Sequence, residues 1–204
     1  MKVVLVTGGA GFIGSHLVDE LLAQGIKVRV LDNLSTGKRQ NLNLGAEFTQ
    51  GDINNLDDIR PAFAGVDCVF HVAALPRVPL SIEQPVVTHM ANAVGTLNVL
   101  VAARDAGVRR LIYSASSSAY GNQPTLPLHE DMTPNPLSPY AIQKLTGEYY
   151  TRAFHQLFKM QTLSLRYFNV FGPRMATEGA YVTVIGTFLR QRREGKPLTV
   201  QGDG

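Results

Sequence analysis

Tyr140 and Lys144 are the two residues whose types and spacing most directly suggest chemistry. Side chains four apart on a helix lie on the same side, about one turn from each other. A nearby ammonium favours phenolate, so Lys144 would lower the pKa of Tyr140 from its usual value of about 10. A tyrosine tuned in this way can take a proton from a hydroxyl while hydride leaves the same carbon. Alone, the pair also fits a solvated helix face.

Glycines crowd the segment 8–14, which we call the glycine turn, in two compatible spacings: Gly9-x-Gly11-x-x-Gly14 and Gly8-x-x-Gly11-x-x-Gly14. An apolar strand (3–6) precedes them, and a run with helical spacing (12–22) follows and stops at Gly25. Strand, glycine turn and helix form the context of a dinucleotide site, because glycines allow a tight turn and a close backbone approach to a diphosphate. The diphosphate would lie at the helix N-terminus.

Asp32 ends the second predicted strand, 27–31, about 20 residues after the glycines, the distance typical of dinucleotide sites. A carboxylate there can accept both hydroxyls of an adenosine ribose and would repel the 2′-phosphate of NADP. No arginine directly follows Asp32. The sequence therefore favours NAD over NADP.

The bulk composition argues against several other classes of protein. The chain has 204 residues, of which 45% are hydrophobic and 17% charged, with a net charge of +3 from dispersed basic residues. This pattern favours a solvated surface over nucleic-acid binding. The single cysteine, Cys68, excludes a disulfide framework, and none of the histidines has zinc spacing, so we expect no metal. No charged leader and no apolar run of bilayer length are apparent, so we expect a cytoplasmic protein without membrane contact.

Strands and helices alternate along the chain, which predicts an α/β fold with a doubly wound parallel sheet, the Rossmann fold. Parallel strands end at one edge, where ligands bind. That edge would gather the glycine turn, Asp32, Asp52, the serine cluster Ser116–Ser118 and Asn169. The segment 75–85 holds three prolines and is predicted not to form regular helix. Further strands are predicted at 47–50, 68–72, 110–114 and 162–167, and helices at 56–63, 86–105, 140–158 and 182–193.

The last residues suggest a longer protein. Residues 196–200 are typical of the start of a strand and 201–204 of a turn, with nothing after them to complete a hairpin. We therefore predict a dinucleotide-binding domain over 1–174 that carries the catalytic residues, and the start of a truncated substrate-binding lobe over 175–204.

The motifs, taken together, resemble the extended short-chain dehydrogenases/reductases, in the nucleotide-sugar epimerase/dehydratase group. The resemblance covers nearly the whole chain, and family members are longer. The motifs that carry it are Thr7-Gly8-Gly9-Ala10-Gly11-Phe12-Ile13-Gly14, Leu31-Asp32-Asn33, Gly51-Asp52-Ile53, His71-Val72-Ala73-Ala74, Asn92-Ala93-Val94-Gly95-Thr96, Tyr113 to Gly121, Tyr140 with Lys144, and Arg166 to Pro173.

The resemblance implies a role for each matching residue. Tyr140 would be the acid/base, Lys144 would bind the nicotinamide ribose, and Ser116 would bond the reacting sugar hydroxyl. The substrate would also meet Val78, Tyr140 and, at its diphosphate, Asn169. The implied NAD-binding residues are Gly8, Gly11, Phe12, Ile13, Gly14, Asp32, Asn33, Leu34, Ser35, Thr36, Gly37, Asp52, Ile53, Ala73, Ala74, Asn92, Ser114, Tyr140, Lys144 and Tyr167.

The serine cluster distinguishes branches of the group. Dehydratases resemble Thr-Asp-Glu at these positions and UDP-glucuronate decarboxylases tend to keep the glutamate, whereas this chain has no carboxylate there. The expected reaction is 4-epimerisation of a UDP-hexose, plain or N-acetylated, through a 4-keto intermediate. The strongest resemblance is to bacterial UDP-N-acetylhexosamine 4-epimerases of polysaccharide pathways, although Pro76-Arg77 departs from them.

Several alternatives stay open at this stage. They are dehydration, decarboxylation or epimerisation of a UDP-glucuronate, carbonyl reduction, and an NAD-binding module without catalysis. Arg77 would either meet a sugar carboxylate or lie in a solvated loop. The resemblance also implies a homodimer, formed through the helices predicted at 86–105 and 140–158.

Overall fold

A computed structural model describes residues 3–175 and 184–200. The chain divides into two compact units, Met1–Phe168 and Asn169–Gly204, each described here by itself. The first unit holds a six-stranded parallel sheet in the order β3-β2-β1-β4-β5-β6. The predicted α/β doubly wound fold is confirmed. The strands are β1 (Val3–Thr7), β2 (Lys27–Asp32), β3 (Glu47–Gln50), β4 (Cys68–His71), β5 (Arg110–Ser116) and β6 (Gln161–Tyr167).

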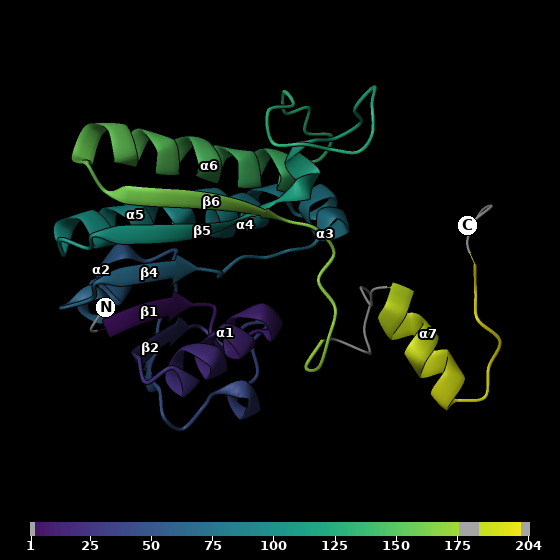
Figure 1. Ribbon diagram of the computed structural model, residues 1–204, viewed down its shortest axis with the longest axis horizontal. Helices are drawn as coiled ribbons and strands as arrows, with labels where there is room; N and C mark the ends of the chain where they lie inside the picture. The colour runs from purple at the N-terminus through teal and green to yellow at the C-terminus, as the bar shows by residue number, and fades with distance from the viewer. Residues whose placement is uncertain (1–2, 176–183, 201–204) are drawn as a thin grey trace. The chain divides into compact units, whose positions relative to one another are not determined.

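Helices cover both faces of the sheet because alternate strand residues point to opposite sides (Figure 1). On one face, α1 (Phe12–Ala23) packs on apolar side chains of β1 and β2, including Val4, Val6 and Val30. On the other face, a larger core contains Leu5, Leu111 and their neighbours. The helices that contribute to this core are α2 (Leu56–Ile59), the 3-10 turn Arg60–Phe63, α5 (Gly95–Asp105) and α6 (Pro139–Phe158).

Helix α6 lies close to β5, and this contact positions the Tyr140/Lys144 turn. A Cβ atom at Gly147 would lie 2.3 Å from the Tyr113 hydroxyl, so only glycine allows the helix this near the strand. The helix begins where the Ser138 hydroxyl accepts the Ala141 N–H at 3.2 Å, with Pro139 in its first turn. Both features are typical of helix N-termini.

The prediction for segment 75–85 was wrong over residues 78–83. The helix α3 (Val78–Glu83) forms there, and α4 (Pro85–His89) begins at the last residue of the segment. Pro79 and Pro85 lie in their first turns, where the missing N–H removes no helical hydrogen bond. The helix predicted at 86–105 is present as α4, a π-helical turn (Met90–Val94) and α5. The π turn was not predicted.

The helical stretch Pro85–Asp105 is long and apolar enough to cross a membrane by length and composition, with a mean hydropathy of 1.4 over its best window. Half of that window is buried within the protein. A core helix satisfies the same criterion, so the observation is weak support for a membrane span.

The second unit contains α7 (Val184–Arg193). It matches the helix predicted at 182–193, of which residues 182 and 183 lie outside the described residues. The strand predicted at 196–200 is not formed: no strand among the described residues pairs with it, and the Thr199 N–H donates to Gln191 Oε1 at 3.1 Å. The turn predicted at 201–204 lies outside the described residues.

A buried chain of hydrogen bonds joins the end of β1 to β4 and α5. Thr96 Oγ1 donates to the Asn92 carbonyl at 2.6 Å, so it accepts the His71 Nε2–H at 3.0 Å. His71 Nδ1 is then the acceptor for the Thr7 hydroxyl at 2.7 Å, and Thr7 in turn accepts the Ala73 N–H. This assignment requires a neutral His71. Burial, followed by the charge of Lys144, lowers the pKa of His71 to about 3.

We expect acid to destabilise the fold through His71. Its folded pKa of about 3 lies below the ordinary 6.5, so as pH falls below about 6.5 the unfolded chain takes up a proton that the folded chain does not. Between pH 6.5 and 5 the free energy of unfolding should fall by up to about 1.4 kcal/mol per pH unit.

Denaturant unfolding at several pH values measures this slope. The slope should flatten in His71→Gln and persist in His129→Gln, a control that removes a histidine exposed in the loop before α6. An equal slope in wild type and His71→Gln contradicts the prediction.

Candidate active site

The glycine turn lies between β1 and α1, directly against the end of β4. Gly8 has a φ of +72°, and a Cβ atom there would lie 2.7 Å from the Ala73 nitrogen. A Cβ atom at Gly14 would lie 2.2 Å from the Gly8 carbonyl oxygen. Larger residues at either position would push apart the turn, α1 and β4. The turn therefore packs Gly8 against the backbone of Ala73 and the first turn of α1, at Gly14, against Gly8.

Asp32, at the end of β2, is 7% exposed and holds two loops together. Its carboxylate accepts the Ala10 N–H at 3.0 Å and the Leu34 N–H at 2.8 Å. A carboxylate can accept about four hydrogen bonds, so capacity remains for ribose hydroxyls. Lys38 N–H donates to the Ala10 carbonyl at 2.9 Å, which folds the predicted NAD-binding residues Leu34, Ser35, Thr36 and Gly37 over the glycine turn.

Asp52 and Ile53 follow β3 and lie beside this loop. The Asn33 amide donates to the Asp52 carboxylate at 3.2 Å, so these two predicted NAD-binding segments are in contact. Ile53 is 8% exposed, and its side chain packs so closely on Gly95 that a Cβ atom there would lie 2.7 Å from it.

Ser116 and Tyr140 meet where β5 ends and α6 begins. Burial raises the pKa of the Tyr140 phenol, and the nearby Ser116 hydroxyl offsets part of this rise. Ser116 is itself fixed, since its hydroxyl accepts the Ser118 N–H at 3.2 Å and donates to the Ser118 hydroxyl at 3.0 Å. The structure thus brings together two of the three predicted catalytic side chains.

Lys144 lies one turn beyond Tyr140 and is 3% exposed. Its ammonium lies 4.5 Å from the centre of the Tyr113 ring, a cation–π contact. Burial lowers the pKa of Lys144 to about 7. The expectation that Lys144 lowers the pKa of Tyr140 is therefore not met in this structure. Desolvation is the main influence on the pKa of the phenol, and the lysine itself loses its charge near neutral pH.

Asn92, a predicted NAD-binding residue, is 1% exposed, and its amide is paired within the protein. Its Oδ1 accepts the Leu75 N–H at 2.8 Å, and its Nδ2 donates to the Leu75 carbonyl at 3.1 Å and to Gln143 Oε1 at 2.9 Å. Both amide hydrogens are used, so the side chain has no donor left for a cofactor.

Two of the other predicted residues lie at the same edge of the sheet. Ser114 and Tyr167 are on the neighbouring strands β5 and β6, in which Ser116 pairs with Tyr167. Val78 begins α3. Asn169 opens the second unit, and its role stays a prediction.

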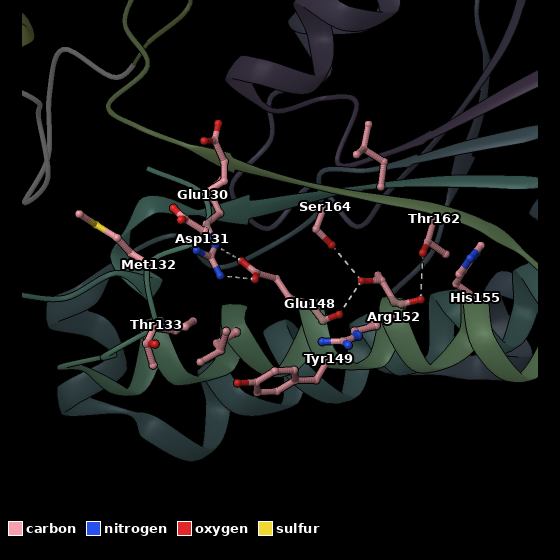
Figure 2. A pocket seen from close by; sticks show the side chains of 15 residues that line it. Glu130, Asp131, Met132, Thr133, Glu148, Tyr149, Arg152, His155, Thr162 and Ser164 are labelled. Atoms are coloured by element: carbon pink, nitrogen blue, oxygen red, sulfur yellow. Dashed lines mark hydrogen bonds and ion pairs between the residues drawn. The ribbon is translucent and has the colours of Figure 1, made fainter. Parts of the chain in front are cut away.

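A groove of about 600 Å³ lies elsewhere, between β6, α6 and the loop before α6. Figure 2 shows the side chains that line it, including the Glu148 carboxylate, which pairs with the Arg166 guanidinium at 2.9 and 2.8 Å. None of the predicted catalytic residues lines this groove. It does not contribute to the candidate active site.

Sequence reasoning missed the buried polar residues that hold these groups in place. Thr7, His71, Thr96, Gln143 and Ser81 are each at most 2% exposed. Ser81 accepts the Tyr140 N–H at 3.0 Å. The sequence signal for Gln143 is limited to its position between Tyr140 and Lys144 on the predicted catalytic helix.

The residues present fit a dinucleotide. The glycine turn leaves out side chains where α1 begins, so backbone N–H groups and the helix dipole are available to a diphosphate. Asp32 supplies the ribose acceptor next to it, and Lys144 and Tyr140 lie at the other end of the same sheet edge. Bound NAD would supply a hydride acceptor and donor there.

Comparison with known proteins agrees with this geometry. The model of the NAD dependent epimerase/dehydratase family matches residues 4–204. The chain is 38% identical over 212 residues to UDP-glucose 4-epimerase of Mycolicibacterium smegmatis, with 98% of the chain and 66% of that protein covered. It is 34% identical over 208 residues to UDP-glucuronic acid decarboxylase 1 of Xenopus tropicalis, with 100% of the chain and 49% of that protein covered.

The crystal structure of UDP-glucose 4-epimerase with UDP-glucose from Thermotoga maritima has a TM-score of 0.96 and 38% identity, and the comparison covers 100% of this chain and 67% of that one. The chain spans 66% of the length of the two curated epimerase relatives that it matches first. Because the family model covers nearly all of its residues, this chain belongs to the NAD dependent epimerase/dehydratase family.

Proposed function

We propose that this chain is the cofactor-binding and catalytic part of an NAD-dependent UDP-hexose 4-epimerase. The observation that carries the proposal is the meeting of Ser116 with Tyr140, beside Lys144 and without a carboxylate in the serine cluster. The similarity to UDP-glucose 4-epimerases supports it. The cellular setting that fits such an enzyme is the cytoplasm, where nucleotide sugars would be its partners rather than nucleic acid or membrane.

In this proposal Tyr140 accepts and later returns the proton of the sugar 4-hydroxyl. Ser116 bonds the same hydroxyl and orients it, while Tyr140 takes its proton as hydride leaves C4 for NAD. The 4-keto sugar then turns its other face toward the cofactor. As hydride returns to C4, Tyr140 returns the proton to the oxygen at this carbon. Lys144, when charged, favours the phenolate that the first half-reaction needs. One tyrosine serves both halves, so no second acid or base is required.

The carboxylate-free serine cluster favours epimerisation over related reactions. Elimination of water needs an additional acid and base, and Ser116, Ser117 and Ser118 offer neither. The similarity to a UDP-glucuronic acid decarboxylase keeps that reaction as the second candidate. The third candidate is an NAD-binding module without turnover, because the chain spans only part of its relatives.

A substrate panel distinguishes these candidates. We expect the chain with NAD to convert UDP-glucose or UDP-N-acetylglucosamine to its 4-epimer without net NADH formation, measured from anomeric protons by NMR. UDP-glucuronate serves as the comparison. Release of carbon dioxide or a pentose signal from UDP-glucuronate would favour decarboxylation. Bound NAD with no turnover of any sugar would favour the non-catalytic module.

Replacing the Tyr140 hydroxyl tests the acid/base assignment. Tyr140→Phe should fold normally and lose about 10²–10⁴-fold in kcat, the usual contribution of general acid–base catalysis. Tyr149→Phe is the matched control, since Tyr149 is on the same helix and 59% exposed, and it should keep full activity. Full activity of Tyr140→Phe with every accepted sugar would rule out the mechanism.

We also propose that the face formed by α4 and α6 binds a second copy of the chain. An apolar groove of about 340 Å³ runs between these helices. Val86, Met90 and Ile142 line it and are 74%, 41% and 52% exposed. Helices with exposed apolar stripes are typical of interfaces between identical subunits.

A charge in this groove should dissociate the dimer. We expect wild type to sediment as a dimer and Ile142→Glu as a monomer, because a carboxylate would be buried without a partner in the interface. Leu44→Glu is the control, since Leu44 is a fully exposed loop residue far along the chain from α4 and α6. A monomeric wild type, or a dimeric Ile142→Glu, contradicts the proposed interface.

A further inference from the structure

Gln143 lies between Tyr140 and Lys144 on α6, and its side chain is 2% exposed. Its Oε1 accepts a hydrogen bond from Asn92 Nδ2 at 2.9 Å. Its Nε2 donates to Thr88 Oγ1 at 3.0 Å and to the Pro85 carbonyl at 3.4 Å. A buried amide with all its groups paired keeps one orientation, because a rotated amide would leave polar atoms unpaired.

Asn92 extends this contact to the segment that follows β4. Its amide binds both the N–H and the carbonyl of Leu75, so the backbone of Leu75 is clamped at two points. Leu75 directly follows Ala73 and Ala74, which lie beside the glycine turn. The π turn around Asn92 places this side chain between α6 and the segment.

Ser81 makes a second link between the same two parts. Its hydroxyl accepts the Tyr140 N–H at 3.0 Å and donates to the Val78 carbonyl at 2.6 Å. The first turns of α6 are thus attached to residues 75–88 through Ser81 at Tyr140 and through Gln143 one turn later. Both links are made by buried side chains.

We propose that Gln143 is a positioning residue: through Asn92 and Thr88 it holds the turn that carries Tyr140 and Lys144 in register with the Leu75–Val78 segment. The inference rests on the proposed function, in which Tyr140 is the acid/base and Val78 borders the sugar. Gln143 touches neither substrate nor cofactor in this role. It fixes the distance between the phenol and the segment that meets the sugar.

The test compares two variants that each lose buried hydrogen bonds from α6. Gln143→Met keeps the length of the side chain and removes its polar atoms. Thr151→Val removes the bond of Thr151, 1% exposed, to the Ser164 hydroxyl at 2.9 Å, about two turns further along the helix. Both variants should unfold at a lower temperature than wild type.

Only Gln143→Met should lose turnover. Its kcat should fall about tenfold to a hundredfold, since a misplacement of about 1 Å at a reacting group has that effect, while KM for the sugar nucleotide and Kd for NAD stay within about twofold. Thr151→Val should keep the kcat of wild type. An unchanged kcat in Gln143→Met, or an equal loss in both variants, overturns the proposal.

Amide hydrogen exchange tests the same inference without substrate. The Leu75 and Tyr140 N–H groups should exchange at least tenfold faster in Gln143→Met than in Thr151→Val. If wild type shows no turnover with any sugar, the proposed function fails while this exchange still decides the role of Gln143. Equal exchange at Leu75 in wild type and Gln143→Met overturns the role.

Discussion

The structure depends on a requirement of solvation: polar groups buried at the carboxyl edge of the sheet must find partners inside the protein. Thr7 meets this requirement through His71, and the same histidine is satisfied by Thr96. The result is that the glycine turn, β4 and α5 cannot move independently without breaking a bond that water does not replace. A neutral His71 is part of this arrangement, since a proton on Nδ1 would remove the acceptor to which the Thr7 hydroxyl donates.

Electrostatics link this network to the catalytic helix. Lys144 is buried close enough that its charge contributes to lowering the pKa of His71, and the rings of His71 and Tyr113 lie 5.6 Å apart. The ammonium lies over the other side chain of this pair, Tyr113. A charged His71 and a charged Lys144 would therefore oppose each other within one small region. The conflict is avoided because the histidine stays neutral, so that only the lysine is charged, below its pKa of about 7.

The parts of this site that could be predicted from sequence are those with local signals. Glycine spacing and a buried strand predicted the turn, and Asp32 followed from its distance along the chain. The helix α3 was missed because proline was treated as a breaker throughout 75–85, although Pro79 lies in a first turn where it is tolerated. The links made by Gln143 could not be predicted, since its partner Asn92 is far away in sequence and the π turn that presents Asn92 has no local signal.

The fold alone does not select a reaction. A decarboxylase relative and epimerase relatives share this framework, so the difference must lie in side chains that the framework does not need. The second residue of the serine cluster, Ser117, is of this kind because it begins the short turn that follows β5, whereas the Ser118 hydroxyl accepts a hydrogen bond from Ser116. Pro76 and Arg77 are also exposed, immediately after a Leu75 whose backbone is clamped. A rigid anchor followed by exposed residues would allow the surface that we propose faces the sugar to change while Tyr140 and Lys144 keep their place.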